Sequence, residues 1–133
     1  MSMPTLVIDI DHTICTPNDS EKDTFEKYGK ATPIPEMISS IRKSKEKGYR
    51  IVLFTARRMA THNGDINKVI EDVGELTINW LREHDVPYDE LMFGKPNAVY
   101  YVDDKALKPH EFVKFIEWDT LWKTLVLQKL ASP

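Results

Sequence analysis

Two aspartates at the end of a short apolar run place the strongest constraint on this chain. Leu6, Val7 and Ile8 precede Asp9 and Asp11, and such a run is typical of a buried strand in a parallel sheet. Side chains alternate along a strand, so both carboxylates are predicted to project from the same side of its carboxyl end. Ligands of open α/β sheets bind at that end. Neighbouring carboxylates repel unless they share a cation or a proton, although a D-x-D can also simply start a turn.

Length and composition predict one globular domain over residues 1–133. Hydrophobic residues make up 41% of the chain and charged residues 29%, which is typical of a soluble domain with its own core. The formal net charge of −3 gives no support for extended nucleic-acid binding. The single cysteine, Cys15, fits a reducing compartment. No apolar run reaches the roughly 18 residues that span a bilayer, and no signal-peptide pattern precedes the strand. We therefore expect a cytoplasmic protein without a membrane partner.

A second apolar run, residues 50–54, ends in Thr55, and a helical pattern lies between the two runs. Strand, helix and strand in this spacing predict a βαβ unit with a right-handed crossover. That unit would place Thr55 at the same sheet edge as Asp9 and Asp11. Polar residues between the first strand and the helix, about residues 12–34, predict an exposed flap.

The remaining chain predicts two further strands and more helix. An apolar 3.6-residue period begins at Ile66 but is interrupted by Gly74, so it predicts a helix chiefly over residues 75–84. Residues 90–93 form a weak strand pattern, and residues 98–102 form a stronger one. Apolar residues then predict a short helix over 109–115 and a C-terminal helix over about 117–131. The apolar surplus of the last helix has two interpretations, packing onto the sheet or a contact between subunits.

Polar residues follow every predicted strand, and a parallel sheet would bring them to one edge. Asp9, Asp103 and Asp104 offer hard oxygen ligands without a soft-metal pattern of histidine or cysteine, which predicts Mg²⁺. A phosphoryl group would satisfy the Thr55 hydroxyl and the Lys95 ammonium. These catalytic and metal candidates are Asp9, Asp11, Thr55, Lys95, Asp103 and Asp104.

With a phosphoryl group at this edge, the candidate residues take separate roles. Asp9 can attack phosphorus and form an aspartyl-phosphate intermediate. Asp11 can protonate the leaving alcohol and later deprotonate water, as general acid and base. Lys95 would offset negative charge around Asp9 and the phosphate.

These motifs resemble those of the haloacid dehalogenase-type phosphatases. The resemblance covers about residues 5–110 and is carried by Asp9-Ile10-Asp11-His12-Thr13, Thr55, Lys95 and Asp103-Asp104, each after an apolar strand. It implies a Rossmann-like three-layer α/β/α sandwich with a mainly parallel sheet. The Asp9 strand would be central, with the Thr55 strand and the third strand on one side and the Asp103 strand on the other.

The same resemblance implies further details of the site. The backbone carbonyl of Asp11 would join Asp9 and Asp103 around Mg²⁺, with Asp104 binding directly or through water. An aspartate at position 11 favours a phosphatase over a dehalogenase or a phosphonatase. The family commonly has glycine where this chain has His12, which could point over the phosphate or merely tolerate the turn.

Within that family, the runs F-T-A-R-R, G-K-P and Y-Y-V-D-D-K are similar to small proteins described as capsule biosynthesis phosphatases. The segments between the motifs are too short for a cap domain, so we expect an open site. Such a site suits a large substrate, or a small one that a neighbouring subunit of a homo-oligomer closes in. The candidate substrate-binding residues are His12, Arg57, Arg58, His62 and Asn63.

Three functions remain open at this point. The leading hypothesis is a Mg²⁺-dependent phosphomonoesterase acting on a sugar phosphate or a similar small metabolite. The second is a 3′-phosphatase on nucleic-acid ends, because capless members of the family include such domains and the T-A-R-R loop is basic, although the net charge argues against it. The third is a non-catalytic binding module of the same fold.

Overall fold

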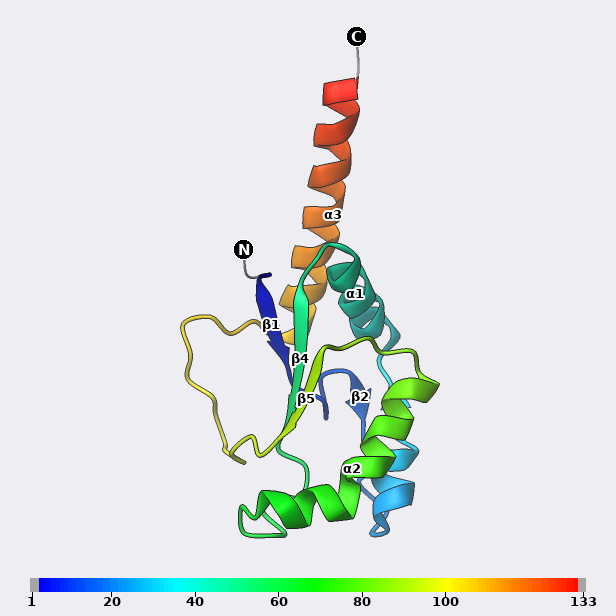
Figure 1. Cartoon of the computed structure of the whole chain (residues 1–133), viewed down its shortest axis with the longest axis vertical. Coiled ribbons are helices and arrows are strands. Elements are labelled where there is room, and N and C mark those ends of the chain that lie inside the picture. Colours follow the sequence, from blue (N-terminus) through cyan, green and yellow to red (C-terminus); the bar gives the residue numbers. More distant parts are fainter. Residues whose placement is uncertain (1–2, 132–133) are drawn as a thin grey trace.

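The centre of the protein is a parallel sheet at whose carboxyl edge the predicted catalytic residues gather. The computed structural model describes residues 3–131, and these form a three-stranded sheet in the order β1-β4-β5 (Figure 1). Ile8 of β1 lies opposite Leu53 of β4, and Thr55 of β4 lies opposite Phe93 of β5. The strands are β1 (Thr5–Ile8), β4 (Arg50–Thr55) and β5 (Glu90–Phe93). The predicted α/β fold with a mainly parallel sheet is confirmed.

The crossover helices begin and end where local sequence signals place them. α1 (Pro35–Glu46) has proline in its first turn, where a missing N–H costs nothing. It is followed by Gly48 at a φ of 94°, in the left-handed region. α2 (Ile66–Glu83) is capped by Asp65, whose carboxylate accepts a hydrogen bond from the Lys68 amide at 3.2 Å.

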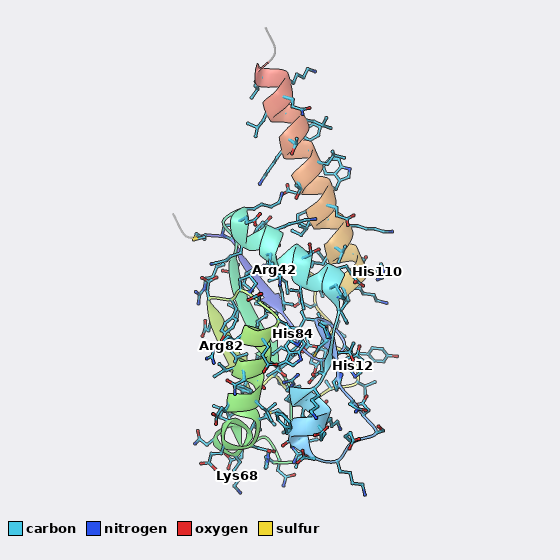
Figure 2. The ribbon with its side chains drawn as sticks, turned by 90° about the vertical axis from the view of Figure 1, so that its right-hand side faces the viewer. His12, Arg42, Lys68, Arg82, His84 and His110 are labelled. Atoms are coloured by element: carbon cyan, nitrogen blue, oxygen red, sulfur yellow. The ribbon has the colours of Figure 1, made fainter. Side chains whose placement is uncertain are left out.

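α2 runs through Gly74, so the helix is longer than its interrupted pattern predicts. Gly74 is buried, and a Cβ there would lie 3.2 Å from Ile70 Cγ2. Figure 1 shows that the helix bends near its middle. The C-terminal end of α2 is joined to α1 by Arg42, which donates to the carbonyls of His84 at 2.8 Å and Asp85 at 3.0 Å (Figure 2).

The predicted flap, residues 12–34, contains regular structure. β2 (Cys15–Thr16) pairs antiparallel with β3 (Thr32–Pro33), and a short π-helical turn, η1 (Phe25–Gly29), lies between them. Trp80 of α2 is buried and donates from its indole Nε1 to the Ala31 carbonyl at 2.9 Å. This bond holds the end of the flap against the helix layer.

One hydrophobic cluster joins the sheet to the helices. Strand alternation sends Ile8, Ile51 and Leu53 into this cluster, whereas Val7 on the opposite side of β1 is 63% exposed. Burial of such side chains is the main favourable contribution to folding. The helices contribute Met37, Ile38 and Ile41 from α1, Trp80 and Leu81 from α2, and Phe112 and Ile116 from α3 (Pro109–Ala131).

The predicted fourth strand, residues 98–102, does not form. This segment lies outside the sheet, with Val99 90% and Val102 99% exposed, and Figure 1 shows it in the yellow loop that leaves the end of β5. The Tyr101 hydroxyl donates to the Pro96 carbonyl and accepts from the Ala98 amide, while the Lys95 ammonium lies 4.1 Å from its ring centroid. These local contacts bend the segment, so the apolar pattern alone predicted the wrong structure here.

The two helices predicted after residue 108 are instead one helix, α3 (Pro109–Ala131). Neither glycine nor proline lies between Glu111 and Ala131, so nothing in the sequence breaks the helix. Both figures show α3 extending well beyond the rest of the domain. Across residues 3–131, no helix combines the length and apolarity that crossing a membrane requires.

Candidate active site

Asp9 directly follows β1 and contacts the positive charge of Lys95, which follows β5 on the far side of β4. Lys95 Nζ lies 3.4 Å from Asp9 Oδ1, and the Thr13 hydroxyl is 3.4 Å from Asp9 Oδ2. Burial raises the pKa of the Asp9 carboxyl above its ordinary value, an effect that Lys95 opposes. Asp9 therefore has a partner for its negative charge while part of its side chain remains exposed.

Asp11 is held by a buried arginine. Arg57 Nη2 donates to Asp11 Oδ1 at 2.8 Å and Arg57 Nε donates to Asp11 Oδ2 at 3.0 Å, a bidentate arrangement. The guanidinium is fully buried and also donates to the Thr77 hydroxyl of α2 at 2.9 Å. Burial opposes the charge of Arg57, but the hydrogen bonds to Asp11 raise its pKa above the ordinary value. Arg57, a predicted substrate-binding residue, is thus directed at Asp11.

Thr55 and Lys95 lie side by side at the ends of β4 and β5. The Lys95 amide donates to the Thr55 carbonyl at 3.1 Å, and the buried Thr55 hydroxyl accepts from the Arg57 amide at 3.1 Å. The second bond turns the chain directly after β4 and sends Arg57 toward Asp11. The structure therefore gathers the four predicted catalytic residues, Asp9, Asp11, Thr55 and Lys95, at the carboxyl ends of the three strands.

Two other predicted substrate-binding residues contact a helix of their own chain. Arg58 Nε lies 2.7 Å and His62 Nε2 lies 2.8 Å from the same Asp72 oxygen on α2. Although burial works in the opposite direction, the hydrogen bonds from His62 and Arg58 lower the pKa of Asp72. These contacts fix the loop after β4 to α2, and exposed Asn63 lies within it at a φ of 49°.

His12 occupies the backbone position where the resembled family commonly has glycine. Its φ is 61°, in the left-handed region that favours glycine, and its amide donates to the Cys15 carbonyl at 2.8 Å. The side chain is 64% exposed, with Nε2 3.8 Å from Asp19 of the flap. Figure 2 shows His12 on the side of the molecule that carries the blue flap. His12 therefore directly follows Asp11 in the chain, and its imidazole is exposed beside the flap.

The Cys15 thiol is buried and lies against the Asp11 carboxylate. Its Sγ is 3.6 Å from Asp11 Oδ1 and 3.6 Å from Arg57 Nη2. Burial, with the nearby Asp11 charge, raises the pKa of Cys15 to about 12. A thiol with this pKa stays protonated at neutral pH and is a poor nucleophile, so its contribution here is packing and a weak hydrogen bond.

The predicted metal ligands are not assembled into one group. Asp103 and Asp104 lie on the exposed segment after β5, and Asp103 accepts from the Lys105 amide at 2.8 Å. This bond lowers the pKa of the Asp103 carboxyl. Within residues 3–131, no three histidine, cysteine or acidic side chains are close enough together to hold a metal ion. The arrangement of these residues therefore does not fit a complete Mg²⁺ site.

Three residues of the site carry no signal that sequence reasoning could use. The Asp72 carboxylate contacts the side chains of Arg58 and His62. The Asp19 carboxylate lies near the His12 imidazole. The Tyr28 ring centroid is 4.8 Å from the guanidinium carbon of Arg57. Each lies outside the strand ends and belongs to a helix or to the flap. Only the tertiary packing of these elements brings them to the site.

Comparison with solved structures identifies a relative that spans nearly the same domain. A crystal structure of a structural-genomics target from Vibrio cholerae superposes with a TM-score of 0.75 at 32% sequence identity. The match covers 87% of this chain and 95% of that one. The chain belongs to the family of this Vibrio cholerae protein. No protein-family model matches the chain, and no curated protein sequence matches it.

Two further structures share the fold at lower identity. A chain of the Pnkp1/Rnl/Hen1 complex matches with a TM-score of 0.51 at 22% identity, over 85% of this chain. A chain of the Pnkp1/Rnl/Hen1 RNA repair complex matches with a TM-score of 0.50 at 18% identity, over 88% of this chain. The matches cover 35% and 32% of those longer chains. The Vibrio cholerae family and the RNA repair chains thus share this α/β fold.

Proposed function

We propose that this chain is a phosphatase of the haloacid dehalogenase type that hydrolyses a phosphomonoester. The observation that carries the proposal is the group at the carboxyl ends of β1, β4 and β5. There Asp9 lies 3.4 Å from Lys95, and Asp11 is held by Arg57 at 2.8 Å. A carboxylate beside an ammonium, next to a second carboxylate in a fixed orientation, suits attack on phosphorus followed by proton transfer.

In the first step, an oxygen of Asp9 attacks phosphorus while the bond from phosphorus to the alcohol oxygen breaks. Asp11 gives its proton to the departing alcohol, leaving an aspartyl-phosphate on Asp9. In the second step, Asp11 takes a proton from water, whose oxygen attacks phosphorus and releases inorganic phosphate and free Asp9. Lys95 and Thr55 stabilise the phosphoryl oxygens through charge and hydrogen bonding.

Mg²⁺ dependence is part of the proposal, with Asp9, the Asp11 carbonyl, Asp103 and Asp104 as ligands. Asp103 and Asp104 would reach Asp9 and Asp11 if residues 98–102 paired with the outer edge of β1. That edge is unpaired within the described sheet, and the segment has the apolar, β-branched composition of a strand. When bound, the ion would supply positive charge to the phosphoryl oxygens.

A small phosphorylated metabolite such as a sugar phosphate is the proposed substrate. The support is the small domain, which has no cap within residues 3–131, and the exposed side chain of His12, which directly follows Asp11 in the chain. The resemblance to capsule biosynthesis phosphatases agrees with a sugar phosphate, in a pathway of capsule polysaccharide. We also propose that the protein is located in the cytoplasm.

A second candidate is a 3′-phosphatase on nucleic-acid ends. The observation that favours it is the likeness to chains of an RNA repair complex. A terminal phosphate needs only a few contacts, so the net charge of −3 does not preclude such a substrate.

A direct test compares hydrolysis of a generic aryl phosphate by the wild-type protein, Asp9→Asn and Asp23→Asn with Mg²⁺ present. Asp23 is an exposed flap residue that contacts the Glu26 amide, so its variant is a matched control for the change of charge. We expect Asp9→Asn to abolish turnover while the protein stays folded, and Asp23→Asn to keep activity of the same order. Undiminished turnover by Asp9→Asn would contradict the mechanism.

A substrate panel then separates the candidates. Sugar phosphates and 3′-phosphorylated oligonucleotides are compared by kcat/KM under the same conditions. A preference for the oligonucleotides would replace the metabolite proposal with the second candidate. No hydrolysis of any phosphate by the folded, Mg²⁺-supplemented protein would favour a non-catalytic binding module of the same fold.

A further inference from the structure

The outer part of α3, residues 118–130, presents a large apolar surface outside the domain. Its seven large apolar side chains are each at least 36% exposed, and both figures show this part of the helix projecting past the other elements. We define it as the α3 arm. Its exposed apolar residues are Trp118, Leu121, Trp122, Leu125, Val126, Leu127 and Leu130.

The arm is held firmly in its projecting direction. Phe112 and Ile116, which lie within the two turns before it, are buried in the core, where α3 packs against α1. Lys47, which follows α1, forms an ion pair with Asp119 at 2.9 Å, and both side chains are mostly buried. The first turn of the arm is thus attached to the domain, and the surface beyond it is presented by a continuous helix.

Helical spacing gathers five of these residues into one stripe. Positions 118, 121, 122, 125 and 126 recur at intervals of three and four, so they lie on one side of the helix. Trp118 and Trp122 stack within the stripe, with ring centroids 5.7 Å apart. A helix with an exposed stripe of this kind usually buries it against another helix.

We propose that the stripe is a dimer interface, in which a second copy of this chain packs its α3 arm antiparallel against the first. The charges of the arm support this occupant. Asp119 is already paired with Lys47 and Lys123 of its own chain. Acidic Glu117 lies at the base of the arm and basic Lys129 lies at its tip, so antiparallel pairing places Lys129 of each copy near Glu117 of the other. A two-fold pair of this kind is self-complementary and closed.

The available apolar area reaches the lower limit of a specific protein–protein interface. Two half-exposed tryptophans and the aliphatic residues of the arm offer roughly 500 Å² of apolar surface per copy, and therefore on the order of 1,000 Å² in a pair. A contiguous apolar patch of this size is at the upper end of what monomers expose, and patches of that size are often functional. A membrane surface is the less favoured occupant, since the arm lacks the excess of lysine or arginine that draws a helix to anionic lipid.

The test measures the mass of the full chain in solution by sedimentation equilibrium up to high micromolar concentration. We expect the wild type to associate to twice the monomer mass of 15.4 kDa. Leu125→Glu, within the stripe, should raise the dimer dissociation constant by roughly thirtyfold or more. Thr124→Glu adds the same charge away from the stripe and should leave the dissociation constant within about threefold of wild type.

A charge exchange tests the antiparallel direction. Lys129→Glu should weaken the dimer by about threefold to tenfold, and adding Glu117→Lys to the same chain should restore it. A monomeric wild type, a Leu125→Glu variant that still dimerises, or a Thr124→Glu variant that dissociates would each overturn the proposal. Binding of a monomeric wild type to phosphatidylserine vesicles would overturn it in favour of a membrane surface. If Glu117→Lys does not restore the dimerisation that Lys129→Glu weakens, the antiparallel arrangement is wrong.

Discussion

Arg57 and Asp11 form a bidentate ion pair between the segments that follow β4 and β1, with donor–acceptor distances of 2.8 and 3.0 Å. The arginine side chain is fully buried, whereas that of Asp11 is 21% exposed. Both oxygens of the Asp11 carboxylate thus accept hydrogen bonds from the buried guanidinium, while part of the Asp11 side chain remains accessible. In the proposed reaction Arg57 is a positioning residue, because it acts through Asp11.

Arg57→Lys should lower kcat while leaving KM within about threefold, because a lysine cannot reproduce the two parallel hydrogen bonds to Asp11. We expect a decrease in kcat of about tenfold to a hundredfold. Steady-state kinetics on an aryl phosphate measure both constants. Arg58→Lys is the matched control, since Arg58 contacts Asp72 on α2 instead. A raised KM with unchanged kcat in Arg57→Lys would indicate that Arg57 binds substrate directly.

Trp80→Phe should destabilise the protein by about 2–3 kcal/mol. Trp80 is buried, and its indole Nε1 donates to the Ala31 carbonyl at the end of the flap. The variant therefore leaves a cavity and a carbonyl without its donor. Urea unfolding followed by circular dichroism gives the free energy of unfolding. Tyr100→Phe is the control, because Tyr100 is exposed outside the sheet, and an equal loss in both variants would contradict the role of the buried bond.

Asp72→Asn should destabilise the protein near pH 7 by about 1 kcal/mol, and this difference from wild type should shrink in acid. Arg58 and His62 lower the pKa of Asp72 in the folded state. The wild-type contribution is therefore complete above the unfolded-state pKa of about 3.9 and is lost as the pH falls through the lower folded-state value. Thermal unfolding of wild type and Asp72→Asn, measured from pH 7 into the acid range, tests whether their difference in stability shrinks as the pH falls. A difference that grows in acid would refute the assignment.

The fold elements predicted correctly are those with local causes. The apolar runs of β1 and β4 and the proline and glycine at the ends of α1 are visible within a few neighbouring residues. Asp9, Thr55 and Lys95 were then placed together by one general rule, that parallel strands end at a common edge. The roles and metal ligands assigned to these residues remain predictions.

The features that were missed depend on contacts distant in sequence or on competing local bonds. Arg57 and Asp11 are 46 residues apart, and nothing in the periodicity around either residue indicates its partner. Residues 98–102 have a strand pattern, but Tyr101 bonds back to Pro96 and the segment leaves the sheet. A one-dimensional pattern records which side chains are apolar, and it does not record which backbone groups a nearby hydroxyl will engage.

Tyr101→Phe should strengthen Mg²⁺ binding by about twofold to fivefold, if pairing of residues 98–102 with β1 assembles the proposed site. The change removes the hydroxyl that bonds Pro96 and Ala98, so the bent form loses stability relative to an extended strand. Isothermal titration with MgCl₂ measures the dissociation constant, and Asp103→Asn should weaken binding in the same assay. An unchanged affinity in Tyr101→Phe would show that the bend does not compete with metal binding.

His12→Gly separates the backbone requirement of this position from a role of the imidazole. Glycine adopts a φ of 61° without the steric cost that histidine incurs, so the free energy of unfolding should stay within about 1 kcal/mol of wild type. If the exposed imidazole contacts the leaving group, kcat/KM for the preferred metabolite should fall by about tenfold. An aryl phosphate without the polar groups of that metabolite should be hydrolysed at nearly the wild-type rate. Equal losses for both substrates would mean that His12 supports the geometry of Asp9 and Asp11, and substrate choice would then depend on another part of the flap.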